Sequence, residues 1–130
     1  MSTYGIAKRL DMDYAQAVEK VTEALKGEGF GVITSIDVKA TMKAKLGRDF
    51  RPYVILGACN PNLAWEALNS EADVGLLLPC NVVVEEAEGG GSRVAAIDPE
   101  AMLSVTGRDD LKELAKDVKA RLNRAIQNCG

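Results

Sequence analysis

The chain has 130 residues, of which 47% are hydrophobic and 27% charged, and this balance predicts one globular domain over residues 1–130. Its net charge of -3 argues against a general nucleic-acid binder, because such proteins usually carry a strongly basic surface. The sequence contains no histidine. Serine-histidine triads, cysteine-histidine proteases and zinc sites with imidazole ligands are therefore excluded.

The cellular setting is inferred from the cysteines and from the apolar segments. The amino terminus has no basic start followed by an apolar run, so no signal peptide is expected. No segment approaches the length of a membrane span, so no membrane association is expected. Three cysteines are too few for a secreted disulfide framework and favour a reduced, cytoplasmic setting. Cys129, next to Gly130, is expected to be exposed.

An alternating stretch followed by a helical stripe opens the chain. Residues 3–10 alternate apolar and polar side chains, which predicts a half-buried strand. From Asp13 the apolar period becomes helical, with Asp13 and Gln16 spaced like a capping box. Gly27 and Gly29 are expected to end this helix. These glycines follow a helix and precede a strand, the reverse of a dinucleotide-binding loop, so no cofactor is expected.

A basic helix is predicted after the second strand. Residues 30–36 are apolar and β-branched, which predicts a strand, and Asp37 can cap a short helix that stops at Gly47. Lys39 and Lys43 lie one turn apart on this helix, so their ammonium groups could converge on a small anion beside the helix start at residue 60. A solvated helix face explains the same charges, and both interpretations stay open.

The middle of the chain predicts a buried strand that leads into a capped helix. Residues 53–59 form a short apolar run bounded by proline and glycine, which favours a strand. Asn60 is a candidate N-cap with Pro61 at the first helical position. Residues 74–78 are interpreted as a packed connector into a strand over residues 80–86.

The last third predicts a hairpin and two helices. Residues 89–91 are three glycines that form a turn into a strand over 93–97, because no helix follows them as a phosphate cradle requires. Asp98 can cap a short helix. A long helix is expected from about 108 to 127, with residues 106–109 spaced for capping. Its apolar face, which needs a sheet to pack on, consists of Leu111, Leu114, Ala115, Val118, Leu122, Ala125 and Ile126.

Several runs of this sequence, in order and over nearly the whole chain, resemble the bacterial and archaeal domain of unknown function 302 family. The runs are Ile36–Thr41 with Lys45–Gly47, Tyr53–Pro61, Gly75–Val84, and Asp98-Pro99 followed by Met102. The resemblance implies an α+β domain with a curved antiparallel sheet and a long C-terminal helix, similar to the TATA-binding-protein-like fold. It also implies a homodimer. It implies no established activity, and the fold likeness does not imply DNA binding.

Two Cys–Asn pairs, placed where predicted strands meet loops, are the leading candidates for chemistry. Cys59 precedes a helix start, whose free N–H groups and dipole favour the thiolate that attacks disulfides, carries persulfide sulfur or binds metal. Cys80 opens a valine-rich strand. Either thiol can instead be a packed core residue. Asn60 and Asn81 either hydrogen-bond a ligand or serve as an N-cap and a strand-edge amide.

The spacing of the thiols weakens two further interpretations. Cys59 and Cys80 lie 21 positions apart and do not form a C-x-x-C redox motif. Two thiolates fall short of the four ligands of structural zinc, so no metal site is expected within one chain. Only a dimer that contributes both cysteines from each subunit would complete such a set.

Three functions remain open from the sequence. The leading hypothesis is a small soluble homodimeric domain that binds a small anionic or sulfur-containing molecule near the two Cys–Asn loops. The second is a redox protein, enzyme or sulfur carrier in which Cys59 forms a disulfide or persulfide. The third is an interaction module whose cysteines are part of the core.

Overall fold

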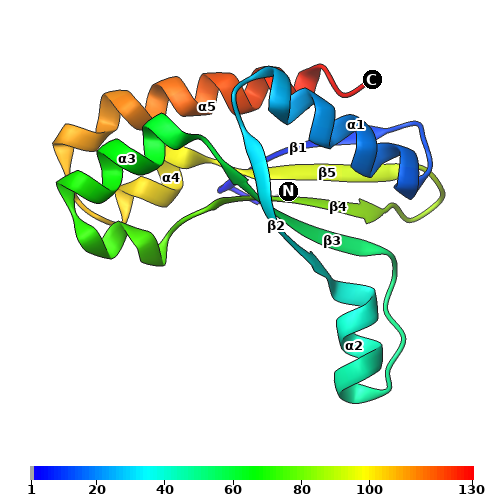
Figure 1. Cartoon of the computed structure of the whole chain (residues 1–130). Coiled ribbons are helices and arrows are strands. Elements are labelled where there is room, and N and C mark those ends of the chain that lie inside the picture. Colours follow the sequence, from blue (N-terminus) through cyan, green and yellow to red (C-terminus); the bar gives the residue numbers. More distant parts are fainter. Residues whose placement is uncertain (1) are drawn as a thin grey trace.

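The fold, seen in a computed structural model that describes residues 2–130, is built on one antiparallel sheet (Figure 1). Its five strands lie in the order β1-β5-β4-β3-β2. The strands are β1 Gly5–Leu10, β2 Gly31–Asp37, β3 Tyr53–Cys59, β4 Cys80–Glu86 and β5 Ser92–Ile97. The hairpin between β4 and β5 turns through three glycines with positive φ, a conformation that side chains disfavour. The predicted α+β class is confirmed, and the arrangement is compatible with a TATA-binding-protein-like fold.

Helices cover only one face of this sheet. They are α1 Tyr14–Gly27, α2 Val38–Leu46, α3 Pro61–Ser70, α4 Pro99–Ser104 and α5 Lys112–Gln127, with short 3-10 turns η1 Ala72–Leu76 and η2 Asp109–Leu111. Figure 1 shows α1, α3, α4 and α5 together on one side, whereas α2 projects away from them beyond the ends of β2 and β3. Within the described residues, no helix has the length and apolar character needed to cross a bilayer.

Four helices begin at the caps that the sequence predicts. In each, the side-chain oxygen of the cap accepts a hydrogen bond from a backbone N–H of the first turn, an interaction worth about 1 kcal/mol. The caps of α1, α2, α3 and α4 are Asp13, Asp37, Asn60 and Asp98. Because this capping is local, it is readable from the sequence.

The core lies between the sheet and the four helices of one layer. Along β4 every second residue is buried, so Cys80, Val82 and Val84 face the helices. From the helix side, α1 contributes Val21 and α5 contributes Leu122, both fully buried. The alternation of β4 therefore orients one face of the sheet inward and leaves the other face uncovered.

The carboxyl-terminal region differs from the sequence-based expectation in two ways. Cys129 is buried rather than exposed, because it continues the inward stripe of α5, and its Sγ donates to the carbonyl oxygen of Ala125 at 3.1 Å. The long helix begins at Lys112 rather than near residue 108. Gly107, just before the expected start, has a positive φ, and this left-handed conformation interrupts the helical backbone. The Thr106 hydroxyl accordingly accepts from the backbone N–H of Arg108, outside the helix.

Two further segments refine the predictions. The connector before β4 contains a 3-10 turn, in which Val74 is buried but Leu76 is exposed, so only part of it is packed. On α5, Leu114 is half-buried, whereas Val118 and Leu122 are buried as expected. Leu111 is buried too, but it lies at the end of η2.

Candidate functional site

A pocket of about 240 Å³ lies where the end of β3 meets the start of α3. It is formed by Cys59 and Cys80 together with aliphatic side chains from β2, β3, α3 and the Leu78–Pro79 connector, and by the backbone of Gly75 in η1. We call it the thiol pocket, and its lining residues are Ile33, Ala58, Cys59, Asn60, Leu63, Ala64, Leu68, Gly75, Leu78, Pro79 and Cys80. The antiparallel register places Ala58 opposite Cys80, and this pairing brings two distant cysteines to neighbouring strands.

The two thiols of the pocket differ in accessibility. Cys80 is 1% exposed, and burial, with a smaller contribution from the nearby Cys59, raises the pKa of its thiol to about 12. Cys80 is therefore protonated at neutral pH. Cys59 is half-buried and immediately precedes α3. Of the two, Cys59 is the thiol that an incoming molecule can reach.

The two asparagines lie apart in the structure. The Asn60 side chain accepts a hydrogen bond from the Leu63 N–H at 3.2 Å and is 8% exposed, so it caps α3 at the rim of the pocket. Asn81 follows the inward-facing Cys80 and therefore points to the opposite face, where it is exposed. The structure thus brings Cys59, Asn60 and Cys80 together and separates Asn81 from them.

The two lysines proposed as anion ligands lie far from the thiol pocket. Helix α2 starts where Asp37 pairs with Val54, five residues along β3 from Cys59 and hence about 17 Å away. Lys43 there forms an exposed ion pair with Asp49 at 3.3 Å. Of the described residues that line the thiol pocket, none is charged. An anion would find no cation in this pocket.

A glycine that sequence reasoning did not single out shapes the pocket. A Cβ at Gly57 would collide with Oγ1 of Thr34 and with Cγ of Pro79, so only glycine lets these side chains close over β3. Pro79 in turn is one wall of the pocket. The only sequence signal for this contact is a glycine inside a strand pattern.

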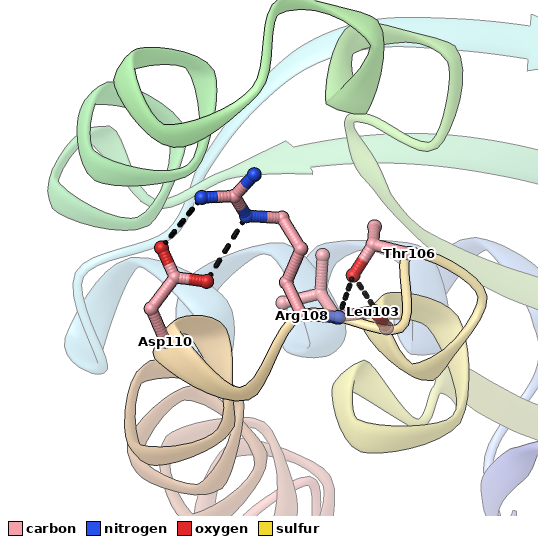
Figure 2. Close-up of polar contacts among 4 residues, drawn as sticks. All are labelled: Leu103, Thr106, Arg108 and Asp110. Atoms are coloured by element: carbon pink, nitrogen blue, oxygen red, sulfur yellow. Dashed lines mark hydrogen bonds and ion pairs between the residues drawn. The ribbon is translucent and has the colours of Figure 1, made fainter.

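A second pocket, of about 550 Å³, lies between α4 and α5 and was also not anticipated. Arg108 lines this pocket, and its Nε and Nη2 donate to the two carboxylate oxygens of Asp110 at 3.0 and 2.9 Å (Figure 2). This pair raises the pKa of Arg108 and lowers that of Asp110. The Thr106 hydroxyl accepts from the Arg108 N–H and donates to the Leu103 carbonyl, which fixes the corner between α4 and η2 (Figure 2).

Two of the cations that line this larger pocket are already paired. Lys112 is paired with Asp109 at 2.9 Å, and Arg108 is occupied by Asp110. Its one hydroxyl, Ser104, donates to a backbone carbonyl within α4. Without histidine in the sequence, this serine has no imidazole base to activate it. The thiol pocket is therefore the better candidate. Among residues 2–130, no group of three or more side chains suited to hold a metal occurs.

Comparison with known proteins identifies the family of this chain. The chain is an α+β domain with an open antiparallel sheet, one layer of helices and a thiol pocket at the end of β3. The family model described as Domain of unknown function DUF302 matches residues 6–129, so the chain belongs to this family. A solved structure of an uncharacterized conserved DUF302 protein from Bacillus stearothermophilus is 32% identical, with a TM-score of 0.90. That alignment covers 99% of this chain and 100% of the other. No curated protein matches, and no specific function follows from the family.

Proposed function

We propose that this protein binds a small, neutral, sulfur-containing molecule in the thiol pocket. The observation that carries the proposal is the convergence of Cys59 and Cys80 on one pocket with otherwise aliphatic walls. Ligand sites are typically apolar concavities with a few polar groups that fix orientation, and the Asn60 amide and the two thiols supply such groups. The absence of charge among the described lining residues favours a neutral ligand over an anionic one.

The size of the pocket limits the ligand. Pockets for drug-sized molecules have volumes of about 300–1,000 Å³, whereas the thiol pocket measures about 240 Å³. A nucleotide is therefore too large, and a short thiol, disulfide or polysulfide fits better. Polarizable sulfur in the ligand would contact both the thiols and the aliphatic walls favourably.

A second candidate function, thiol exchange at Cys59, rests on the accessibility of that one thiol beside a helix start. In this reaction the Cys59 thiolate attacks one sulfur of a bound disulfide. A new S–S bond to Cys59 forms as the ligand's S–S bond breaks, and the leaving thiolate takes the electron pair. The exchange requires no separate oxidant. Cys80, protonated at neutral pH, would contact the ligand as a neutral thiol and not act as a second nucleophile.

We also propose a cytoplasmic setting. The three cysteines are unpaired, and the two buried ones, Cys80 and Cys129, lie inside a core that needs no disulfide. A reducing compartment would keep Cys59 available for ligand binding.

Reaction kinetics with 4,4'-dithiodipyridine, a small neutral disulfide, test the proposal. If the probe binds in the thiol pocket before it reacts, the labelling rate of Cys59 should saturate as the probe concentration rises. Gly75→Leu should abolish saturation, because a Cβ at Gly75 makes ordinary contact with Leu68 and the longer side chain fills the pocket. Gly27→Leu is the matched control, since its Cβ meets nothing within 4 Å.

The remaining controls separate binding from simple reactivity. Cys59→Ser should remove the fast reaction entirely. The dianionic Ellman reagent should react without saturation, because the pocket offers it no cation. A linear dependence on dithiodipyridine concentration in the unmodified protein would contradict the proposed binding, even if Cys59 reacts.

A further inference from the structure

A pocket of about 260 Å³ lies between the start of α3 and the middle of α5, two helices of the same layer (Figure 1). We call it the α3–α5 pocket. Its polar lining residues are Asn60, Asn62, Asp117 and Arg121. Asn60 also lines the thiol pocket, but Arg121 does not. The α3–α5 pocket is therefore a separate space, and it contains the positive charge that the thiol pocket lacks.

One end of the Asn60 side chain has an unused donor. Its Oδ1 accepts from the Leu63 N–H, and this bond fixes the orientation of the amide, whereas its Nδ2 forms no hydrogen bond with the described residues. Within residues 2–130, no fully buried side-chain nitrogen or oxygen lacks a partner, so Nδ2 must reach open space although Asn60 is 8% exposed. A Cβ added at Gly29 would lie 3.9 Å from Nδ2, and Gly29 lines only the α3–α5 pocket of the two. A nearly buried donor therefore points into this pocket.

The first turn of α3, a helix of ten residues, supplies a second donor. The first N–H groups of a helix have no intrahelical acceptor. Asn60 satisfies the N–H of Leu63 through its side chain and that of Ala64 through its carbonyl oxygen. Pro61 has no N–H, so the N–H of Asn62 is left without a partner among the described residues. Asn62 lines the α3–α5 pocket.

Arg121 supplies the charge of the α3–α5 pocket. Its Nε donates to Oδ2 of Asp117, one helical turn earlier, at 3.2 Å, and both side chains are partly exposed. Exposed ion pairs at this spacing contribute little to stability, so this pair can yield to a competing anion. The two Nη groups of Arg121 form no hydrogen bond with another described residue. They are available to a ligand without any change in the fold.

The chemistry of these groups suits a carboxylate with a short apolar tail. A guanidinium presents its N–H groups as a planar fork that matches the two oxygens of a carboxylate. Asp117 offsets the charge of Arg121, so a singly charged anion is favoured over a dianion. Leu63 and Val118 line the same pocket and are buried, so they offer an apolar wall for an alkyl chain.

We propose that the α3–α5 pocket binds a short aliphatic carboxylate, whose oxygens accept from Nδ2 of Asn60, the N–H of Asn62 and the Nη groups of Arg121. This site goes beyond the ligand of the thiol pocket and does not depend on it. The sequence suggested an anion beside this helix start, held by two lysines of α2. In the proposed site the cation comes from α5 instead.

Titration of the isotope-labelled protein with sodium butanoate, followed by NMR at constant ionic strength, tests the site. The side-chain amide signals of Asn60 and the N–H signal of Asn62 should shift and saturate together. Butanamide, which has the same chain length but no charge, should give no saturating shift. Arg121→Gln should weaken butanoate binding by about tenfold or more, because it removes a charged donor. Arg124→Gln is the matched control, since Arg124 lies on the same helix, pairs with Glu28 and does not line the pocket.

Two further variants separate recognition from folding. Asn60→Asp keeps an oxygen that can cap α3 but replaces the donor by a negative charge, so it should abolish butanoate binding while the helix stays capped. Asp117→Asn removes the carboxylate that competes for Arg121 and should tighten binding. A residue with a purely structural role would not produce these opposite effects.

Three outcomes would overturn the proposal: saturation by butanamide, equal saturation by sulfate, or an unchanged affinity for butanoate in Arg121→Gln. If Asn60→Asp does not fold by circular dichroism, Arg121→Gln decides alone, because Arg121 is partly exposed. Arg121→Gln should leave the saturation with dithiodipyridine at Cys59 unchanged, because Arg121 does not line the thiol pocket. The two binding proposals can therefore fail independently.

Discussion

Burial gives the three thiols of this protein different chemical characters. Cys80 and Cys129 are each 1% exposed, and burial raises the pKa of both thiols, whereas Cys59 is half-buried. Since the thiolate is the reactive form, iodoacetamide at neutral pH should label Cys59 first in folded protein. Cys80 and Cys129 should label only after denaturation. Peptide mass mapping reads the order, and a Cys59 that stays silent until denaturation would contradict both thiol-based functions.

Cys80 also links stability to alkaline pH. Its pKa is about 12 in the folded protein but about 8.5 in an unfolded chain. The folded state therefore holds the proton more tightly. The resulting stabilisation is fully present below about pH 8.5 and declines as the pH rises from there toward 12. Cys80→Ala should lose stability less steeply than the unmodified protein between about pH 9 and 11. Urea titrations at each pH measure the free energy of unfolding of both proteins. If the two free energies fall in parallel as the pH rises, Cys80 does not contribute to this pH dependence.

At the scale of the element, the N-caps should contribute different amounts to the free energy of unfolding, because their helices bury different numbers of side chains. Asn60→Ala removes the cap of α3, which buries Leu63 and Ala67, and should lower the free energy of unfolding by about 1 kcal/mol. Asp37→Ala removes the same kind of bond from α2, which buries no residue, and should lower the free energy of unfolding by less. Urea denaturation compares the two variants. Equal losses would indicate that α2 is as tightly coupled to the core as α3.

The stripe of α5 makes a second element-scale prediction. Leu122 is fully buried, so Leu122→Asp places an unpaired charge in the core at a cost of several kcal/mol, against a total stability of about 5–15 kcal/mol. That variant should be unfolded or close to it. Leu114 is only half-buried, so Leu114→Asp should remain folded with a lower melting temperature. Circular dichroism melts distinguish them, and normal melting of Leu122→Asp would contradict the packing of α5.

At the scale of the whole molecule, we expect residues 1–130 to unfold as one domain. The sheet and the helices of one layer share a single cluster of buried side chains, so neither can lose its partner and remain stable. Calorimetry should show one transition with an enthalpy of about 90 kcal/mol near 60 °C, at about 0.7 kcal/mol per residue. Two resolved transitions would indicate that part of the chain, with α2 and the ends of β2 and β3 as the first candidate, unfolds separately.

The sequence by itself determined the order of the elements and the starts of four helices, because caps, turns and apolar periods act between residues close in the chain. Asp13, Asp37, Asn60 and Asp98 each cap the helix that their spacing predicts. The start of α5 is the exception, because the left-handed conformation of Gly107 was not readable from the spacing of residues 106–109.

Only the tertiary structure decided which candidate residues meet. Cys59 and Cys80 share a pocket because the register of β3 and β4 pairs Cys80 with Ala58, the neighbour of Cys59. Lys39 does not line this pocket, because α2 lies at the other end of β3. Cys129, just beyond α5, lies on the same side as the buried side chains of that helix and is itself buried. Strand register and the choice of covered face depend on the packing of segments far apart in sequence, and this packing creates both the thiol pocket and the uncovered face of the sheet.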